Sequence, residues 1–179
     1  MSLTINQQPR LCPPPHRFRP AVNVSHAEWG EQPSFIKDAS KHRNKGKRAD
    51  GVNYEKKVHK YLEPMFGDHY IKSPWFHFIS NGRKADCQAD ALLTHIPGTL
   101  VIVEVKLSHT SNAWWQTTQL YQPVVEKLFE GKGINHIRHL EVVKWFDPAV
   151  PFPQKFNFAD DPTKITGPHD YNVHIWNGR

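Results

Sequence analysis

The residues best suited to chemistry in this chain are Glu104 and Lys106, two charged side chains inside an apolar stretch that runs from Thr99 to Leu107. Valine and isoleucine dominate this stretch and Pro97-Gly98 precedes it, a pattern typical of a largely buried strand. Because side chains alternate along a strand, the two charges share one face. Burying a carboxylate and an ammonium costs free energy unless they are paired or bind something. The stretch therefore predicts that Glu104 and Lys106 pair with each other or bind a ligand.

A further acidic residue, Asp90, lies on the preceding predicted strand, over residues 86–95. If the two strands form an antiparallel hairpin, the number of loop residues decides which face Asp90 occupies. An odd loop of about three residues places Asp90 opposite Glu104 or Lys106, whereas a two-residue loop places it opposite Val105 and points it away. We adopt the odd loop, or a bulge, so the sequence predicts that the three charged side chains cluster.

Asp90 followed by Glu104-Val105-Lys106 on the next strand resembles the PD-(D/E)XK nuclease superfamily. The proline that names the motif is absent, since Ala89 precedes Asp90, and members of the superfamily commonly vary there. Two other Glu-x-Lys triplets, at residues 55–57 and 130–132, are not in apolar strands. The alternative interpretation is a Glu–Lys pair on the solvent face of a two-sided strand.

The resemblance implies a Mg²⁺-dependent nuclease that hydrolyses DNA phosphodiester bonds, with Mn²⁺ as a substitute metal. It assigns Asp90, Glu104, the Val105 carbonyl and Glu55 to the metal. Lys106 would orient or help deprotonate the attacking water, or stabilise the developing negative charge. The assignment is chemically consistent, because Mg²⁺ prefers carboxylate oxygens and a cation offsets the repulsion between carboxylates.

A helix is predicted over residues 51–67, with Asp50 as a capping residue. Its apolar stripe consists of Tyr54, Val58, Tyr61, Leu62 and Met65. Glu55 stands at the border of this stripe, and in the superfamily a glutamate on the first helix often joins the metal site. The alternative is a surface glutamate that pairs with His59 or favours the positive end of the helix dipole.

A second helix is predicted over residues 113–129, with Asn112 as its cap and a kink at Pro123. Its predicted inner face consists of Trp114, Thr118, Tyr121, Val125 and Leu128. In similar nucleases a glutamine on this helix often lies near the catalytic lysine. Gln116 and Gln119 are both candidates, and we name Gln119 as a catalytic residue. The Gln-x-x-x-Tyr spacing of the RecB-like group is not met, because Thr117 stands four residues before Tyr121.

The resemblance implies an α/β fold with an αβββαβ restriction-endonuclease-like core, in which helices flank a central mixed sheet. Further strands are predicted at 69–79, interrupted at Pro74, and at 139–146. Residues 49–146 would form this core. Residues 1–48 read as a basic, proline-rich N-terminal arm, and residues 147–179 as an irregular C-terminal extension with an edge strand at 171–176.

The net charge of +6 and the pI of about 9.3 favour a polyanionic partner, here DNA. Two groups of cations are candidate phosphate contacts, Lys41, Arg43, Lys45, Lys47 and Arg48 before the first helix, and Arg83 and Lys84 before Asp90. For the first group, a solvated linker is the alternative. A homo-oligomer or an assembly partner could hold the N-terminal arm.

No apolar run approaches the roughly 20 residues of a membrane span. Residues 1–10 have no secretory signal pattern, and Cys12 and Cys87 are far apart, which suits a reducing cytoplasm. A virion location would apply to a phage-encoded chain. A nuclease-like fold that serves as a nucleic-acid-binding or structural component of a larger assembly, such as a phage particle, stays open as the alternative function. A nuclease directed at RNA is a third and weaker alternative.

Overall fold

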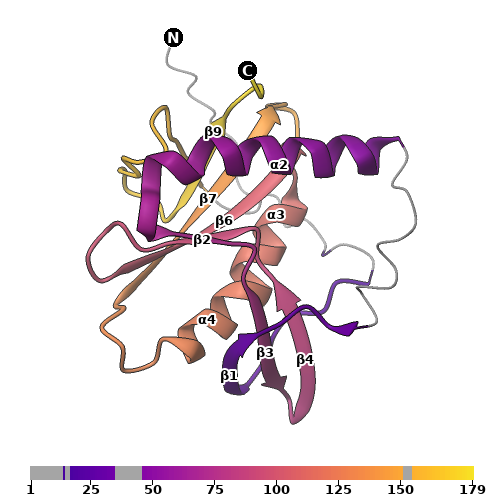
Figure 1. The fold of residues 1–179 in the computed structure, drawn as a ribbon, viewed down its shortest axis with the longest axis vertical. Helices are drawn as coiled ribbons and strands as arrows, with labels where there is room; N and C mark the ends of the chain where they lie inside the picture. The colour runs from indigo at the N-terminus through magenta and orange to yellow at the C-terminus, as the bar shows by residue number, and fades with distance from the viewer. Residues whose placement is uncertain (1–13, 15–16, 35–45, 151–154) are drawn as a thin grey trace.

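The structure is a computed structural model that describes residues 14, 17–34, 46–150 and 155–179. Its helical elements are α2 (Lys47–Phe66), η1 (Gly67–His69), α3 (Ser111–Trp115), η2 (Gln116–Tyr121) and α4 (Gln122–Leu128). Its strands are β1 (Val24–Gly30), β2 (Tyr70–Lys72), β3 (Trp75–Ser80), β4 (Arg83–Gln88), β5 (Ala91–Leu93), β6 (Thr99–Ser108), β7 (His136–Trp145), β8 (Asn157–Phe158) and β9 (Tyr171–Ile175). Figure 1 shows these elements in order along the chain.

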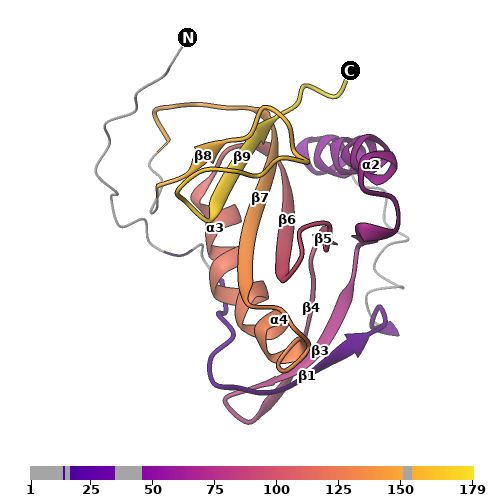
Figure 2. The same ribbon diagram turned by 90° about the vertical axis from the view of Figure 1, so that its left-hand side faces the viewer.

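The larger sheet is mixed and has the strand order β2-β5-β6-β7-β9-β8. Strand β5 is antiparallel to β2 and β6, whereas β6, β7, β9 and β8 run parallel to one another. Helix α2 lies over one face, and α3 and α4 lie on the opposite face (Figures 1 and 2). The prediction of an α/β fold with a mixed central sheet between helices is confirmed.

A smaller antiparallel sheet, β1-β3-β4, stands beside the larger one. It corrects the prediction of one strand over residues 86–95, because β4 ends in the smaller sheet at Gln88 and β5 starts in the larger sheet at Ala91. A turn at Asn81-Gly82 joins β3 to β4, and Arg83 already belongs to β4. Strand β1 comes from the predicted N-terminal arm, and the ring of Trp29 packs 5.6 Å from that of Phe76.

Helix α2 is held to the sheet by its apolar stripe. Tyr54, Val58 and Leu62 are buried against Val101, Val103 and Val105 of β6. Two details of the prediction are wrong. Phe66 is buried at the end of the stripe, and Met65 is exposed. The helix also starts earlier, at Lys47, so Asp50 lies within its first turn instead of capping it.

The second helical region differs more from the prediction. It starts at Ser111 after Thr110, and no side chain caps it, so the assignment of Asn112 as the cap is wrong. The segment η2 is π-helical, and the wider turn shifts the buried face. Ala113, Thr117 and Val124 are buried in addition to Tyr121, Val125 and Leu128, whereas Trp114 and Thr118 are only half-buried. Pro123, just after η2 ends, has no N–H to donate, and the carbonyl of Gln119, four residues earlier, accepts the N–H of Ala21 instead.

The C-terminal residues complete the sheet. Strand β9, predicted as an edge strand, pairs with β7, and the two-residue β8 lies outside it. Beyond β9, the ring of Trp176 stacks on Tyr61 of α2 at 4.3 Å. Across the described part of the chain, no helix is both long and apolar enough to cross a membrane.

His139 gives β7 a measurable pH dependence. Its ring is buried, its Nε2 lies 2.9 Å from Gln122 Oε1, and burial lowers its pKa from 6.5 to about 4 although Asp170 acts in the opposite direction. The folded state thus binds this proton more weakly than the unfolded chain does. The stability that His139 contributes is therefore complete above pH 6.5 and is lost as the pH falls toward 4.

We expect the His139 ring to account for about 2 kcal/mol of lost stability between pH 7 and pH 5. The variant His139→Phe should lose that much less stability over the same interval. Urea denaturation of both proteins at the two pH values measures the difference. An equal pH dependence in both proteins would show that His139 is not buried in its neutral form.

Candidate active site

The end of β6 is an open sheet edge. Strand β5 pairs with β6 only as far as Ala91 opposite Val103, so the next position along β5, Asp90, falls opposite Glu104. The intervening connection, residues 94–98, is odd-numbered and longer than predicted, and the register is the one that the odd loop requires. Before Asp90 the chain lies in β4 of the smaller sheet. Residues 104–106 of β6 therefore have no strand partner on that side.

The side chain of Asp90 takes the place of the missing strand. Its Oδ2 accepts a hydrogen bond from the backbone N–H of Val105 at 2.7 Å. The Asp90 backbone carbonyl in turn accepts the Ser73 N–H at 2.8 Å, which fixes the turn between the two sheets. In a strand the N–H and C=O of one residue point to the same side, so the Val105 carbonyl also faces this edge.

Glu104 and Lys106 form a close pair on the same face of β6. The distance between Glu104 Oε1 and Lys106 Nζ is 2.5 Å, and the side chains are 2% and 28% exposed. The second oxygen of Glu104, Oε2, has no hydrogen-bond partner among the described residues. One oxygen of a fully buried carboxylate is thus satisfied by an ion pair, and the other is available to a ligand.

The carboxylates at this edge interact electrostatically. Burial, followed by the charges of Glu104 and Glu55, raises the pKa of Asp90 well above its ordinary value. Burial also raises the pKa of Glu104, although Lys106 acts in the opposite direction. Burial alone would lower the pKa of Lys106, but Glu104 outweighs this effect and raises it, so Lys106 is cationic at neutral pH.

Glu55 reaches the same cluster from α2. Its side chain is 38% exposed, and its Oε1 lies 3.5 Å from Nε2 of His59, which is itself held by Tyr70 through a 2.6 Å contact between His59 Nδ1 and the phenol oxygen. The charge of Glu55 acts on both Asp90 and Glu104. Glu55 thus lies close to His59, as one alternative predicted, and its charge also acts on the other carboxylates of this cluster.

The cluster has the donor types of a Mg²⁺ site but not the assembled geometry of one. It offers three carboxylates, an unpartnered Glu104 oxygen and the Val105 carbonyl, all oxygen donors that suit Mg²⁺. Within the part of the chain that the structure describes, no three His, Cys, Asp or Glu side chains converge closely enough to hold a metal ion. Asp90 and Glu104 are instead occupied by Val105 and Lys106.

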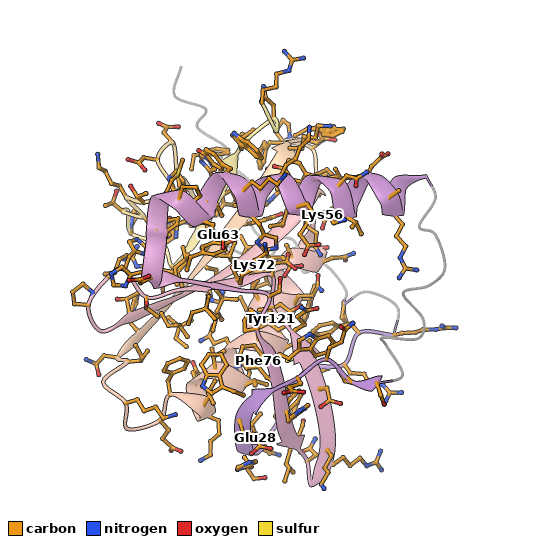
Figure 3. The ribbon with its side chains drawn as sticks, in the orientation of Figure 1. Glu28, Lys56, Glu63, Lys72, Phe76 and Tyr121 are labelled. Atoms are coloured by element: carbon orange, nitrogen blue, oxygen red, sulfur yellow. The ribbon has the colours of Figure 1, made fainter. Side chains whose placement is uncertain are left out.

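Of the two glutamines considered, Gln116 is the one linked to this cluster. Its side chain hydrogen-bonds Tyr121, a buried phenol whose pKa is raised well above its ordinary value by burial and then by the charges of Glu104 and Asp90. Tyr121 belongs to the same buried cluster as Phe76 of the smaller sheet, and Figure 3 labels both residues. Gln119, which we assigned as catalytic, has its Nε2 3.4 Å from Thr118 Oγ1, and its backbone carbonyl accepts the N–H of Ala21.

Sequence reasoning missed a second buried glutamate. Glu141 on β7 lies in register with Glu104, and its charge contributes to the raised pKa of Glu104. Its Oε2 is 2.9 Å from Nδ1 of His109 and accepts the hydroxyl of Tyr171 at 3.1 Å. The isolated acid in the apolar run 140–143 was a detectable signal, of the same kind as Glu104. No sequence pattern linked His109 or Tyr171 to it.

The predicted phosphate-binding cations are widely distributed. Lys41, Arg43 and Lys45 lie outside the described residues, whereas Lys47 and Arg48 lie in the first turn of α2 and Arg48 is exposed. Arg83 and Lys84 are exposed at the tip of the β3–β4 hairpin, about 20 Å along the chain from Asp90. Figure 1 shows this hairpin extending away from α2.

The Glu104–Lys106 pair predicts a large effect on stability when the cation is removed. In Lys106→Met, Glu104 keeps a buried charge without its partner, so we expect a loss of about 3 kcal/mol at pH 8. The loss should shrink at pH 5.5, because Glu104 can then take up a proton. The double variant Lys106→Met/Glu104→Gln should return to within about 1 kcal/mol of the wild type. Chemical denaturation measures all three values.

Lys127→Met is the matched control. Lys127 also lies 2.5 Å from a carboxylate, that of Glu130, but the Glu130 side chain is 68% exposed. Its removal should therefore cost less than about 1 kcal/mol at either pH. If Lys106→Met cost no more than Lys127→Met, Glu104 would not be a buried charge that depends on Lys106.

Comparison of this chain with protein-family models, with curated proteins and with solved structures gave no match. The features that indicate a function are therefore those of the chain's own residues. These are the acidic cluster at the open edge of β6, the cationic Lys106 beside it, and the buried Glu141 on the neighbouring strand.

Proposed function

We propose that this chain is a Mg²⁺-dependent nuclease that hydrolyses DNA, with Asp90, Glu104 and Lys106 as its catalytic residues. The observation that carries the proposal is the arrangement at the open edge of β6. There Asp90 faces Glu104, Lys106 Nζ lies 2.5 Å from Glu104, and the second Glu104 oxygen lacks a partner among the described residues. Acid and cation in this order on a hairpin are what the PD-(D/E)XK resemblance requires.

Phosphodiester hydrolysis needs stabilisation of negative charge and an activated water. Mg²⁺ or Mn²⁺, held by Asp90, Glu104, the Val105 carbonyl and Glu55, would supply the Lewis acid. Lys106, beside Glu104, would orient or help deprotonate the attacking water, or stabilise the developing negative charge. Gln116 and Tyr121, next to the acidic cluster, are better placed than Gln119 to orient groups there.

The fold supports the proposal through the order of its elements. Helix α2, the strands that lead to β6, the helical region α3–α4 and strand β7 follow one another as in an αβββαβ restriction-endonuclease-like core. Strand β7 is parallel to β6, and the helical region α3–α4 provides the crossover that parallel neighbours need. The separate β1-β3-β4 sheet is a departure from a core built on one sheet.

A second candidate is a nuclease-like chain that binds nucleic acid without cutting it, as a component of a larger assembly such as a phage particle. It is favoured by the contacts of two carboxylates in the cluster, because Asp90 accepts the Val105 N–H and Glu104 pairs with Lys106. The net charge of +6 suits either candidate. Under the first candidate, the nuclease, the proposed substrate is DNA and the proposed location is the cytoplasm.

Cleavage assays on supercoiled, linear, branched and single-stranded DNA test the proposal. The wild type should cut at least one substrate with Mg²⁺ or Mn²⁺. Ca²⁺, with its looser coordination, should support binding more than turnover. Asp90→Asn, Glu104→Gln and Lys106→Met should each lower the rate by about a hundredfold or more, because residues that act as a unit are strongly non-additive.

Glu130→Gln is the matched control, since it removes a glutamate from another Glu-x-Lys triplet, on an exposed surface. It should leave the cleavage rate unchanged. Glu55→Gln should reduce the rate and raise the Mg²⁺ concentration required if Glu55 binds the metal. Tight DNA binding with no cleavage of any substrate would favour the second candidate, a binding component of an assembly. Normal cleavage by Asp90→Asn and Lys106→Met would show that these residues are not the catalytic site.

A further inference from the structure

A cleft with a volume of about 880 Å³ lies beside the acidic cluster. Its walls are the first half of α2, the C-terminal ends of β6 and β7, and the chain end at Asn177-Gly178. Polypeptide at the carboxyl ends of parallel strands commonly forms ligand sites. None of Asp90, Glu104 and Lys106 lines the cleft.

The lining of this cleft is basic. Lys56 and Lys57 contribute to it from α2 and Lys144 from β7, whereas Asp50 is its one acidic lining residue in the part of the chain that the structure describes. Figure 3 shows Lys56 on the length of α2 that crosses the sheet. Three cations against one carboxylate favour an anionic ligand, and amides of Asn53 and Asn177 add neutral hydrogen-bonding groups.

The cleft also contains an aromatic surface. Trp145 ends β7, and 49% of the residue is exposed. The Lys144 ammonium lies over one face of the Trp145 ring, 4.6 Å from its centroid, so a base would stack on the opposite face. Aromatic rings interleaved with cations are the recurring design of sites for single-stranded nucleic acid, because bases stack on the rings while phosphates meet the charges.

The cleft adjoins the acidic cluster along two elements. Lys56 directly follows Glu55 on α2, and Leu107 and Ser108, which line the cleft, directly follow Lys106 on β6. Two residues of strand span about 7 Å, so Ser108 is that close to Lys106 along the backbone. A polynucleotide in the cleft would thus have its next phosphates near Glu55 and Lys106.

We propose that this cleft binds a single strand of nucleic acid, with one base stacked on Trp145 and the flanking phosphates near Lys56, Lys57 and Lys144. A duplex does not fit this role, because its base faces are already stacked and cannot reach an indole. The proposal that the strand continues to the catalytic residues rests on the proposed nuclease function, whereas binding in the cleft does not.

Fluorescence anisotropy of labelled oligothymidylate, measured in EDTA so that no cleavage occurs, tests the binding. Trp145→Ala should weaken binding about tenfold, and Trp145→Phe, which keeps a ring, should recover most of the affinity. The triple variant Lys56→Ala/Lys57→Ala/Lys144→Ala should flatten the slope of log affinity against log salt by about two. A duplex of the same length should bind more weakly and be insensitive to Trp145→Ala.

The matched control removes three exposed lysines that do not line the cleft, in Lys60→Ala/Lys132→Ala/Lys164→Ala. This variant has the same net charge as the cleft triple, so general attraction to DNA predicts equal effects. The proposal would be overturned if the two triple variants had equal effects on binding, or if binding did not depend on Trp145. It would also be overturned if the wild type did not bind oligothymidylate, or if polyglutamate competed as well as unlabelled oligothymidylate. If the wild type cuts DNA alongside any of these results, the nuclease proposal is kept and the cleft proposal is rejected. If oligothymidylate binding depends on Trp145 but no DNA is cut, the cleft proposal is kept and the nuclease proposal is rejected.

Discussion

Repulsion between carboxylates at the end of β6 is the constraint on which the rest of the site depends. Burial and then the charges of Glu104 and Glu55 raise the pKa of Asp90, and burial and then the charges of Glu141 and Glu55 raise the pKa of Glu104. Glu141 is itself a buried acid on the next strand. Such groups are tolerated only when each charge has a compensating partner. Lys106 provides it for Glu104, the Val105 N–H for Asp90, and Tyr171 and His109 for Glu141.

The fold creates the place where these partners can meet. Because the chain crosses from the smaller sheet to the larger one at Ala89-Asp90, β6 loses its neighbour beyond Val103 and exposes the polar backbone of Val105. Helix α2 then brings Glu55 over this edge and Lys56 and Lys57 over the cleft beside it. Glu55 of the acidic cluster and Lys56 and Lys57 of the basic cleft are thus consecutive residues of the same helix.

Local patterns predicted the central parts well. The apolar run around Glu104 and Lys106 formed a strand, the stripe of Tyr54, Val58 and Leu62 formed a buried helix face, and loop parity placed Asp90 opposite Glu104. The assignment of residues 86–95 to two sheets depends on pairing with distant strands, which no local pattern contains. The π-helical turn at η2 likewise shifted the buried face away from 3.6-residue periodicity, which is why Thr117 is buried and Thr118 is not.

Titration calorimetry of Mn²⁺ binding most directly tests the central claim that the acidic cluster is a cation site. The wild type should bind Mn²⁺ saturably, and binding should weaken as the pH falls, because raised pKa values make protons stronger competitors of the metal for Asp90 and Glu104. Asp90→Asn and Glu104→Gln should each abolish binding, whereas Glu126→Gln, on the exposed part of α4, should not. Equal Mn²⁺ binding by the wild type and both site variants, or none by the wild type, would contradict the account.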